Sequence, residues 1–160
     1  DHGAGIPARL HAGTVAGHFG HAVALSGAFP VNWWDRYVGL PFGEGRGEVT
    51  CWSLVVRVFA EVRAISLPAY GEIPARDLVR IARTMGREQL GETWAAVAAP
   101  ESFDVAIMRS GSGRSAIVHV GVMIDAARML HVEAASHAVV VPIAHHSVRG
   151  RIAGFRRYRA

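Results

Sequence analysis

The sequence predicts an α+β protein in which helices come first and an antiparallel sheet follows. Between Asn32 and Ala98, hydrophobic residues recur mostly with a helical period. From Phe103 onward, strand-like runs are separated by turn signals such as Gly-Ser-Gly. The chain has 160 residues, 51% of them hydrophobic, which suits one globular core and is too many for a disordered chain.

The start of the chain has a different composition. Residues 1–30 are rich in Gly, Ala and His and follow neither the helical nor the strand period. They begin without Met and carry no basic segment before their apolar stretch, so we do not expect a cleavable signal peptide. We expect residues 1–30 to be an N-terminal extension or arm that need not belong to the native domain, and residues 31–160 to form the domain.

Helices are expected in the first part of that domain. A short helix is predicted from Asn32, its N-cap, to Val38, where Gly39 ends it. A longer helix is predicted over about Thr50–Ala64, because its apolar residues form a wide stripe and Thr50 is a suitable N-cap, which places Cys51 in the first turn. Two further helices are expected at about residues 75–84 and 90–98.

The second part of the domain is expected to form an antiparallel sheet of about five to six strands. Strands are predicted at residues 104–109, 116–124, 128–133, 138–143 and 152–158. A hairpin centred on Asp125 would place His119 nearly opposite His131, with both side chains on one face of the sheet.

Cys51 and these two histidines are the candidate catalytic residues. Cys51 is the only cysteine, which excludes an internal disulfide and a Cys-rich zinc module. At a helix N-terminus the amide N–H groups and the macrodipole favour thiolate, so we expect the pKa of Cys51 to lie below about 8.5. His119 would take the thiol proton and His131 would orient His119. The alternative, a buried free thiol with two core histidines, is less favoured because buried imidazoles need hydrogen-bond partners.

Other features limit the partners and cofactors. His137, His145 and His146 could join His131 in a metal site, but they have no regular ligand spacing, so we expect no metal ion and no cofactor. No apolar run reaches the length of about 18 residues that a membrane span needs. The net charge of +4 favours an anionic surface without selecting one.

Several segments resemble motifs of the NlpC/P60 cysteine peptidases, and the similarity covers about residues 32–158. Residues 51–59 (CWSLVVRVF) resemble the family's nucleophile helix, Cys-x-x-Leu-Val-x-x-Val-[Phe/Tyr], which is followed by Leu-Pro as here. Residues 119–124 (HVGVMI) resemble its His-Val-Gly-Ile-Tyr-[Leu/Ile] strand. Three further segments match its pattern: Tyr37–Phe42, residues 103–106 and residues 129–132.

The resemblance implies a papain-like α+β fold, with N-terminal helices packed on the sheet, and hydrolysis of peptidoglycan stem peptides. It makes Cys51 the nucleophile, His119 the general base and His131 the third member of a Cys-His-His triad. The most similar type is the phage, prophage and gene-transfer-agent one. That type implies a tail-tip location, other tail-tip or hub proteins as partners, synthesis in the bacterial cytoplasm and action on the host cell wall or periplasm, with no nucleic-acid partner.

Three candidate substrate-binding residues depart from the family pattern. Phe42 replaces a tyrosine, and Trp52-Ser53 follow the cysteine where the family has Ser-Gly. None of these changes touches the triad, so we expect activity to survive. Two alternatives stay open: a structural tail-tip component with a vestigial peptidase fold, and a thiol-dependent amidase or acyltransferase acting on another amide.

Overall fold

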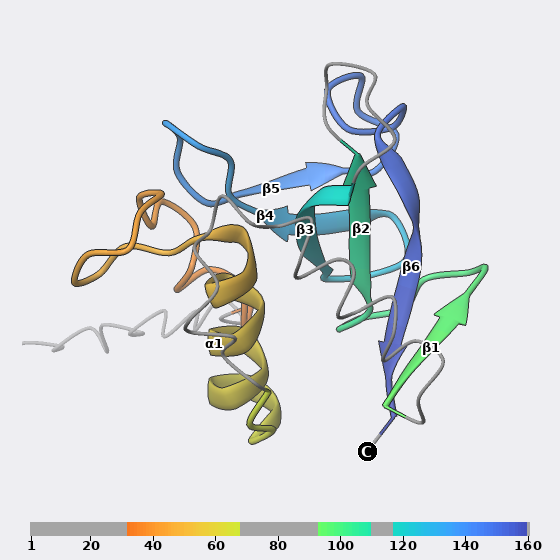
Figure 1. Ribbon diagram of the computed structural model, residues 1–160, viewed down its shortest axis with the longest axis horizontal. Coiled ribbons are helices and arrows are strands. Elements are labelled where there is room, and N and C mark those ends of the chain that lie inside the picture. The colour runs from red at the N-terminus through yellow and green to blue at the C-terminus, as the bar shows by residue number, and fades with distance from the viewer. Residues whose placement is uncertain (1–31, 68–92, 110–116, 160) are drawn as a thin grey trace, which may run out of the picture. The chain divides into compact units, whose positions relative to one another are not determined.

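The computed structural model describes residues 32–67, 93–109 and 117–159 (Figure 1). All of them belong to one compact unit that spans Val31–Ala160. The extension at residues 1–30 and the helix expected at residues 75–84 lie outside the described residues. The domain boundary after residue 30 therefore stays a prediction.

Helix α1 (Cys51–Arg63) confirms the helix predicted over about Thr50–Ala64. The Thr50 hydroxyl accepts a hydrogen bond from the backbone N–H of Ser53, and the Ser53 hydroxyl accepts one from that of Thr50, which closes a capping box. At the other end Ala64 adopts a left-handed conformation and its N–H donates to the Phe59 carbonyl. Cys51 is thus held as the first residue of a well-capped helix.

Within the part of the chain that the structure describes, six strands form one antiparallel sheet, in the expected range of five to six. They are β1 (Trp94–Val97), β2 (Val105–Arg109), β3 (Ile117–Met123), β4 (Arg128–His131), β5 (Val139–Pro142) and β6 (Ile152–Tyr158). The strand order is β1-β6-β2-β3-β4-β5. Strands β2 to β5 make a meander, and β6 returns to pair with β2 on its other side (Figure 1).

The prediction of a helix at residues 90–98 is wrong for the part of this segment that the structure describes. There, Trp94–Val97 form the edge strand β1, which pairs with β6. The sequence Trp-Ala-Ala-Val suits a helix or a strand, and tertiary contacts decide between them. The Trp94 indole lies edge-on to Tyr158, with ring centroids 5.2 Å apart, and packs beside Phe59. These contacts favour the strand.

The short helix expected from Asn32 to Val38 is also wrong, because residues 33–39 form a series of turns. The N–H of Tyr37 donates to the carbonyl of Trp34, three residues back, rather than four as in an α-helix. The segment is too short for its few hydrogen bonds to offset the free-energy cost of helix nucleation. The predicted end is confirmed, since Gly39 has a φ of 88°.

Helix α1 packs on one face of the sheet (Figure 1). Leu54, Val55, Val58 and Phe59 of the helix join inward-facing side chains such as Val120 of β3 in the main hydrophobic core. A smaller cluster contains Met108, Met123, Met129 and Val148. The two clusters take alternate residues of the same strands, as the strand period requires.

Candidate active site

Cys51 lies where the N-terminus of α1 meets β3, with only 2% of its surface exposed. The backbone N–H groups of Val120 in β3, and of Trp52 and Cys51 in the first turn of the helix, lie close enough to its sulfur to favour the thiolate. Val120 directly follows His119 in the chain. The fold therefore brings the predicted nucleophile to the backbone of the strand that carries the predicted base.

The N–H of Val120 is available to Cys51 because β3 and β4 stop pairing before they reach it. Their last paired residues at this end are Val122 and Leu130. The N–H of Ile124 donates to the carbonyl of Arg128 in β4. Because N–H directions alternate along a strand, the N–H of Val120, four residues earlier, also points toward β4.

His119 and His131 meet on one face of the sheet, as predicted. His119 Nε2 and His131 Nδ1 are 2.9 Å apart, and the rings are inclined at 73°. The register is shifted by two residues from a hairpin centred on Asp125: Val122 lies opposite Leu130, and Gly121 rather than His119 lies beside His131. The two rings therefore meet diagonally. A Cβ on Gly121 would lie 3.1 Å from the Cβ of His131, so glycine leaves room for the second imidazole.

Burial keeps both imidazoles neutral. Desolvation, followed by the charges of His131 and Arg151, lowers the pKa of His119 from 6.5 to about 3. Desolvation also lowers the pKa of His131, although Glu133 opposes the shift. Neutral rings can share one proton across the 2.9 Å contact, one nitrogen donating and the other accepting.

The expected lowering of the thiol pKa is wrong for this state of the protein. Burial raises the pKa of Cys51 to about 11, although the N–H groups of Val120, Trp52 and Cys51 act in the opposite direction. Loss of hydration therefore outweighs the helix N-terminus. These shifts favour a neutral thiol beside neutral imidazoles over a thiolate–imidazolium pair.

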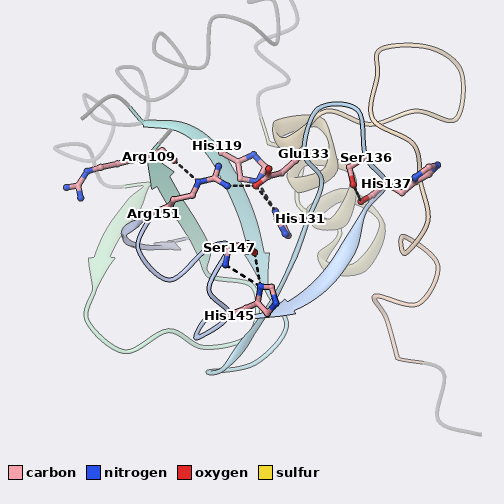
Figure 2. A network of polar contacts seen from close by, with 9 residues as sticks. All are labelled: Arg109, His119, His131, Glu133, Ser136, His137, His145, Ser147 and Arg151. Atoms are coloured by element: carbon pink, nitrogen blue, oxygen red, sulfur yellow. Dashed lines mark hydrogen bonds and ion pairs between the residues drawn. The ribbon is translucent and has the colours of Figure 1, made fainter. Parts of the chain in front are cut away.

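A charged pair that the sequence analysis missed lies beside the histidines (Figure 2). Arg151 Nη1 is 2.5 Å from Glu133 Oε1, and its Nε donates to the carbonyl of Arg109 at 3.0 Å. Glu133 Oε1 is 3.9 Å from His131 Nδ1. The spacing His131-x-Glu133, which puts both residues on one side of an extended chain, was an available signal. No local pattern pointed to Arg151, because it comes from the connection between β5 and β6.

The three candidate substrate-binding residues have different surroundings. Phe42 is half-buried in a loop. Its backbone N–H donates to the Ser136 carbonyl at 3.0 Å, so this loop lies beside the segment that follows β4. Trp52 is 3% exposed and belongs to the core. Ser53 is exposed, and its hydroxyl takes part in the capping box with Thr50. Contact of any of the three with substrate stays a prediction.

Among the described residues, the loop histidines His137 and His145 are not part of the cluster of potential ligands around His131. His145 Nδ1 is 2.8 Å from the Ser147 hydroxyl, and His137 is exposed in a bridge with Pro41 (Figure 2). Within the described ranges, one group offers three ligand atoms within 4.8 Å of one another: His119, His131 and Glu133.

Taken together, the helix, the sheet and the cysteine at the helix N-terminus define an α+β, papain-like fold. Comparison with solved structures gives the same class, because the structural neighbours are NlpC/P60 family proteins. One is a Staphylococcus aureus protein described as similar to a lipoprotein of the NLP/P60 family, with a TM-score of 0.54 and 16% identity over 81% of this chain and 39% of that one. Another is the NlpC/p60 domain of the peptidoglycan hydrolase SagA, with a TM-score of 0.51 and 14% identity over 79% of this chain and 93% of that one.

A third neighbour is an NlpC/P60 family protein from Bacillus cereus, with a TM-score of 0.54 and 17% identity over 76% of this chain and 36% of that one. This chain thus spans less than half the length of the Staphylococcus and Bacillus proteins. No family model matches the sequence, and no curated protein matches it either. None of the described helices is long and apolar enough to cross a membrane. The comparisons establish the fold, and the activity has to be argued from the site.

Proposed function

We propose that this protein is a cysteine peptidase that cleaves peptidoglycan stem peptides. The observation that carries the proposal is the 2.9 Å contact between His119 Nε2 and His131 Nδ1, next to the strand residue whose N–H meets the Cys51 sulfur. A second imidazole on the far nitrogen of the first is what an orienting residue provides. The likeness to a peptidoglycan hydrolase domain supports the choice of substrate.

In the proposed reaction the Cys51 sulfur attacks the peptide carbonyl carbon and the thiol proton moves to His119 Nδ1. Nδ1 is the nitrogen that remains once Nε2 is bonded to His131. His119 then gives this proton to the leaving amine, and water later hydrolyses the thioester. Because the resting thiol is neutral, proton transfer accompanies the attack rather than preceding it.

The N-terminus of α1 would stabilise the charge that develops on the substrate. The N–H groups of Cys51 and Trp52 already favour the anionic form of the sulfur. The same groups can donate to the oxyanion of a tetrahedral intermediate, where each preorganised donor contributes about 3 kcal/mol in comparable sites. The role of Trp52 would thus come from its backbone, since its indole belongs to the core.

Digestion of purified sacculi tests the activity. Wild type should release muropeptides that mass spectrometry assigns to a cut in the stem peptide, and Cys51→Ala should release none. His145→Ala is the matched control, because His145 is an exposed histidine bonded to Ser147. Equal release by wild type and Cys51→Ala would refute the thiol mechanism. Transfer of the acyl group to an added amine instead of water would favour the alternative acyltransferase.

We also propose where the protein acts. We place the protein at the tail tip of a phage or phage-like particle, made in the cytoplasm and acting on the host wall, on the strength of its sequence motifs. Mass spectrometry of purified particles should then detect the chain together with tail proteins. If particles carrying Cys51→Ala entered cells as well as wild type, the structural alternative without turnover would be correct instead.

A further inference from the structure

The two imidazoles are hydrogen-bonded to each other, and together with Glu133 they form a potential set of metal ligands. Two histidines and one glutamate are a set that zinc uses in enzymes. His119 Nε2, His131 Nδ1 and the Glu133 carboxylate lie within 4.8 Å of one another (Figure 2). The individual separations are 2.9 Å between the two nitrogens and 3.9 Å between His131 Nδ1 and Glu133 Oε1.

We propose that His119, His131 and Glu133 bind a divalent ion of the zinc class, and that this ion inhibits the Cys51 site without contacting the sulfur. The inhibition rests on the proposed peptidase function, whereas the binding does not. The proposal differs from the sequence expectation of no metal, which considered His131 together with distant loop histidines.

The separations suit a small tetrahedral ion. At bond lengths of about 2.1 Å, tetrahedral ligand atoms lie about 3.4 Å apart. The observed 2.9 Å and 3.9 Å lie on either side of this value, and all three ligand atoms lie within 4.8 Å of one another. To close the site, the two rings would turn so that both nitrogens face the ion, and the carboxylate would move toward His119. The fourth position would be left to water.

Access to the site is from the side of Glu133. Its side chain is 41% exposed, whereas that of His131 is 6% exposed. Glu133 is the ligand that an arriving ion meets first, and Arg151 is the group that competes for it at 2.5 Å. Replacing the guanidinium by a neutral side chain should therefore tighten binding.

Metal binding would prevent His119 from acting as the base, because it would move the single ring proton from one nitrogen to the other. If His131 Nδ1 accepts from His119, the proton of His131 is on its Nε2, and its Nδ1 is ready for a metal. His119 must instead free its Nε2, so its single proton moves to Nδ1. Nδ1 is the nitrogen that would accept the thiol proton. Once Nδ1 carries the proton of the ring, it has no free lone pair for the thiol proton.

The experiment measures binding and inhibition separately. Zn²⁺ is titrated calorimetrically into the full chain, and Co²⁺ spectra report tetrahedral coordination. All variants carry glutamine at the histidines of the extension, so that ions bound there do not contribute: His2, His11, His18 and His21. Cys51→Ser should keep the wild-type Kd, since the sulfur is not a ligand. His131→Gln and Glu133→Gln should each raise Kd at least about tenfold.

Two further variants complete the test. Arg151→Met should lower the Kd, and His145→Gln, away from the site, should leave it unchanged. Loss of binding in Cys51→Ser, or unchanged binding in both His131→Gln and Glu133→Gln, would overturn the proposal. Because binding is measured without substrate, an inactive protein that binds Zn²⁺ in this pattern would refute the peptidase and keep the metal site. Active protein that binds Zn²⁺ here without inhibition would refute the proton argument.

Discussion

At the scale of single residues, the site is governed by burial more than by the sequence features that pointed to it. The helix N-terminus predicted a reactive thiolate at Cys51, and its N–H groups do act in that direction. The thiol is nevertheless 2% exposed, and the cost of placing a charge there is larger. Sequence identifies the residue and its position in the helix, but the depth of burial depends on the packing of β3 against α1.

Alkylation of Cys51 should therefore rise with pH well beyond the range of an ordinary thiol. With burial raising the pKa of Cys51 to about 11, the iodoacetamide rate should increase roughly tenfold per pH unit between pH 7 and 10. The rate of glutathione, measured in parallel, levels off sooner. A flat rate from pH 5 to 8 would instead reveal a thiolate–imidazolium pair and contradict the neutral resting state.

Replacements at His131 should separate orientation from proton transfer. His131→Ala removes the partner of His119 Nε2, so activity on sacculi should fall by a factor of about 10 to 1,000 without being abolished. His131→Asn or His131→Gln should recover part of this loss, because an amide oxygen accepts the same N–H. Thermal melts serve as the folding control. Full activity of His131→Ala would make His131 a structural residue.

At the scale of elements, strong periodicity was a reliable guide and short ambiguous segments were not. Helix α1 and strands β2 to β6 were predicted because each has an extended apolar pattern bounded by caps or turns. Strand β1 was missed because four residues, Trp-Ala-Ala-Val, carry too little pattern to oppose pairing with β6. The shared face of His119 and His131 followed from the period of two, whereas their register depends on where the turn after β3 begins.

The observed register gives Gly121 a role that can be tested. A Cβ at this position would lie 3.1 Å from the His131 Cβ and also 3.1 Å from the Met129 sulfur, so β4 must move slightly to accept it. Gly121→Ala should displace His131 from His119 and lower activity at least about tenfold, at a cost of about 1–3 kcal/mol in stability. The measurements are sacculus digestion and chemical denaturation.

Gly150→Ala is the matched control for that variant, because a Cβ on Gly150 would meet nothing within 4 Å. It should keep both activity and stability. If Gly121→Ala behaved in the same way as Gly150→Ala, the close approach of the second imidazole would not depend on the missing side chain.

At the scale of the whole molecule, the site is assembled from segments far apart in the chain. Cys51 comes from α1, the two histidines from β3 and β4, and Arg151 from the connection that leads into β6. Sequence motifs identified the first three because each lies in a recognisable local pattern. Arg151 reaches Glu133 only because the antiparallel sheet returns β6 to the side of β2, and no local pattern encodes that.

The buried groups should also set the pH range in which the fold is most stable. The pKa of folded His119 is about 3, below its usual 6.5, so between these values the unfolded chain binds the additional proton. Stability is fully present above about pH 6.5 and is lost as the pH falls toward 3, by about 3 kcal/mol at pH 4 from this residue. The pKa of folded Cys51 is about 11 against 9.0, so its contribution is present below pH 9 and is lost as the pH rises toward 11.

Urea denaturation from pH 4 to 10 should therefore give a plateau between about pH 6.5 and 9. His119→Gln should flatten the acid side of this profile, and Cys51→Ala should flatten the alkaline side, because each removes the group whose pKa differs between the folded and unfolded states. Each variant is the control for the other, since His119→Gln leaves the thiol in place and Cys51→Ala leaves the imidazole. An acid side equally steep in wild type and His119→Gln would show that other groups, such as His131 or carboxylates, cause the loss.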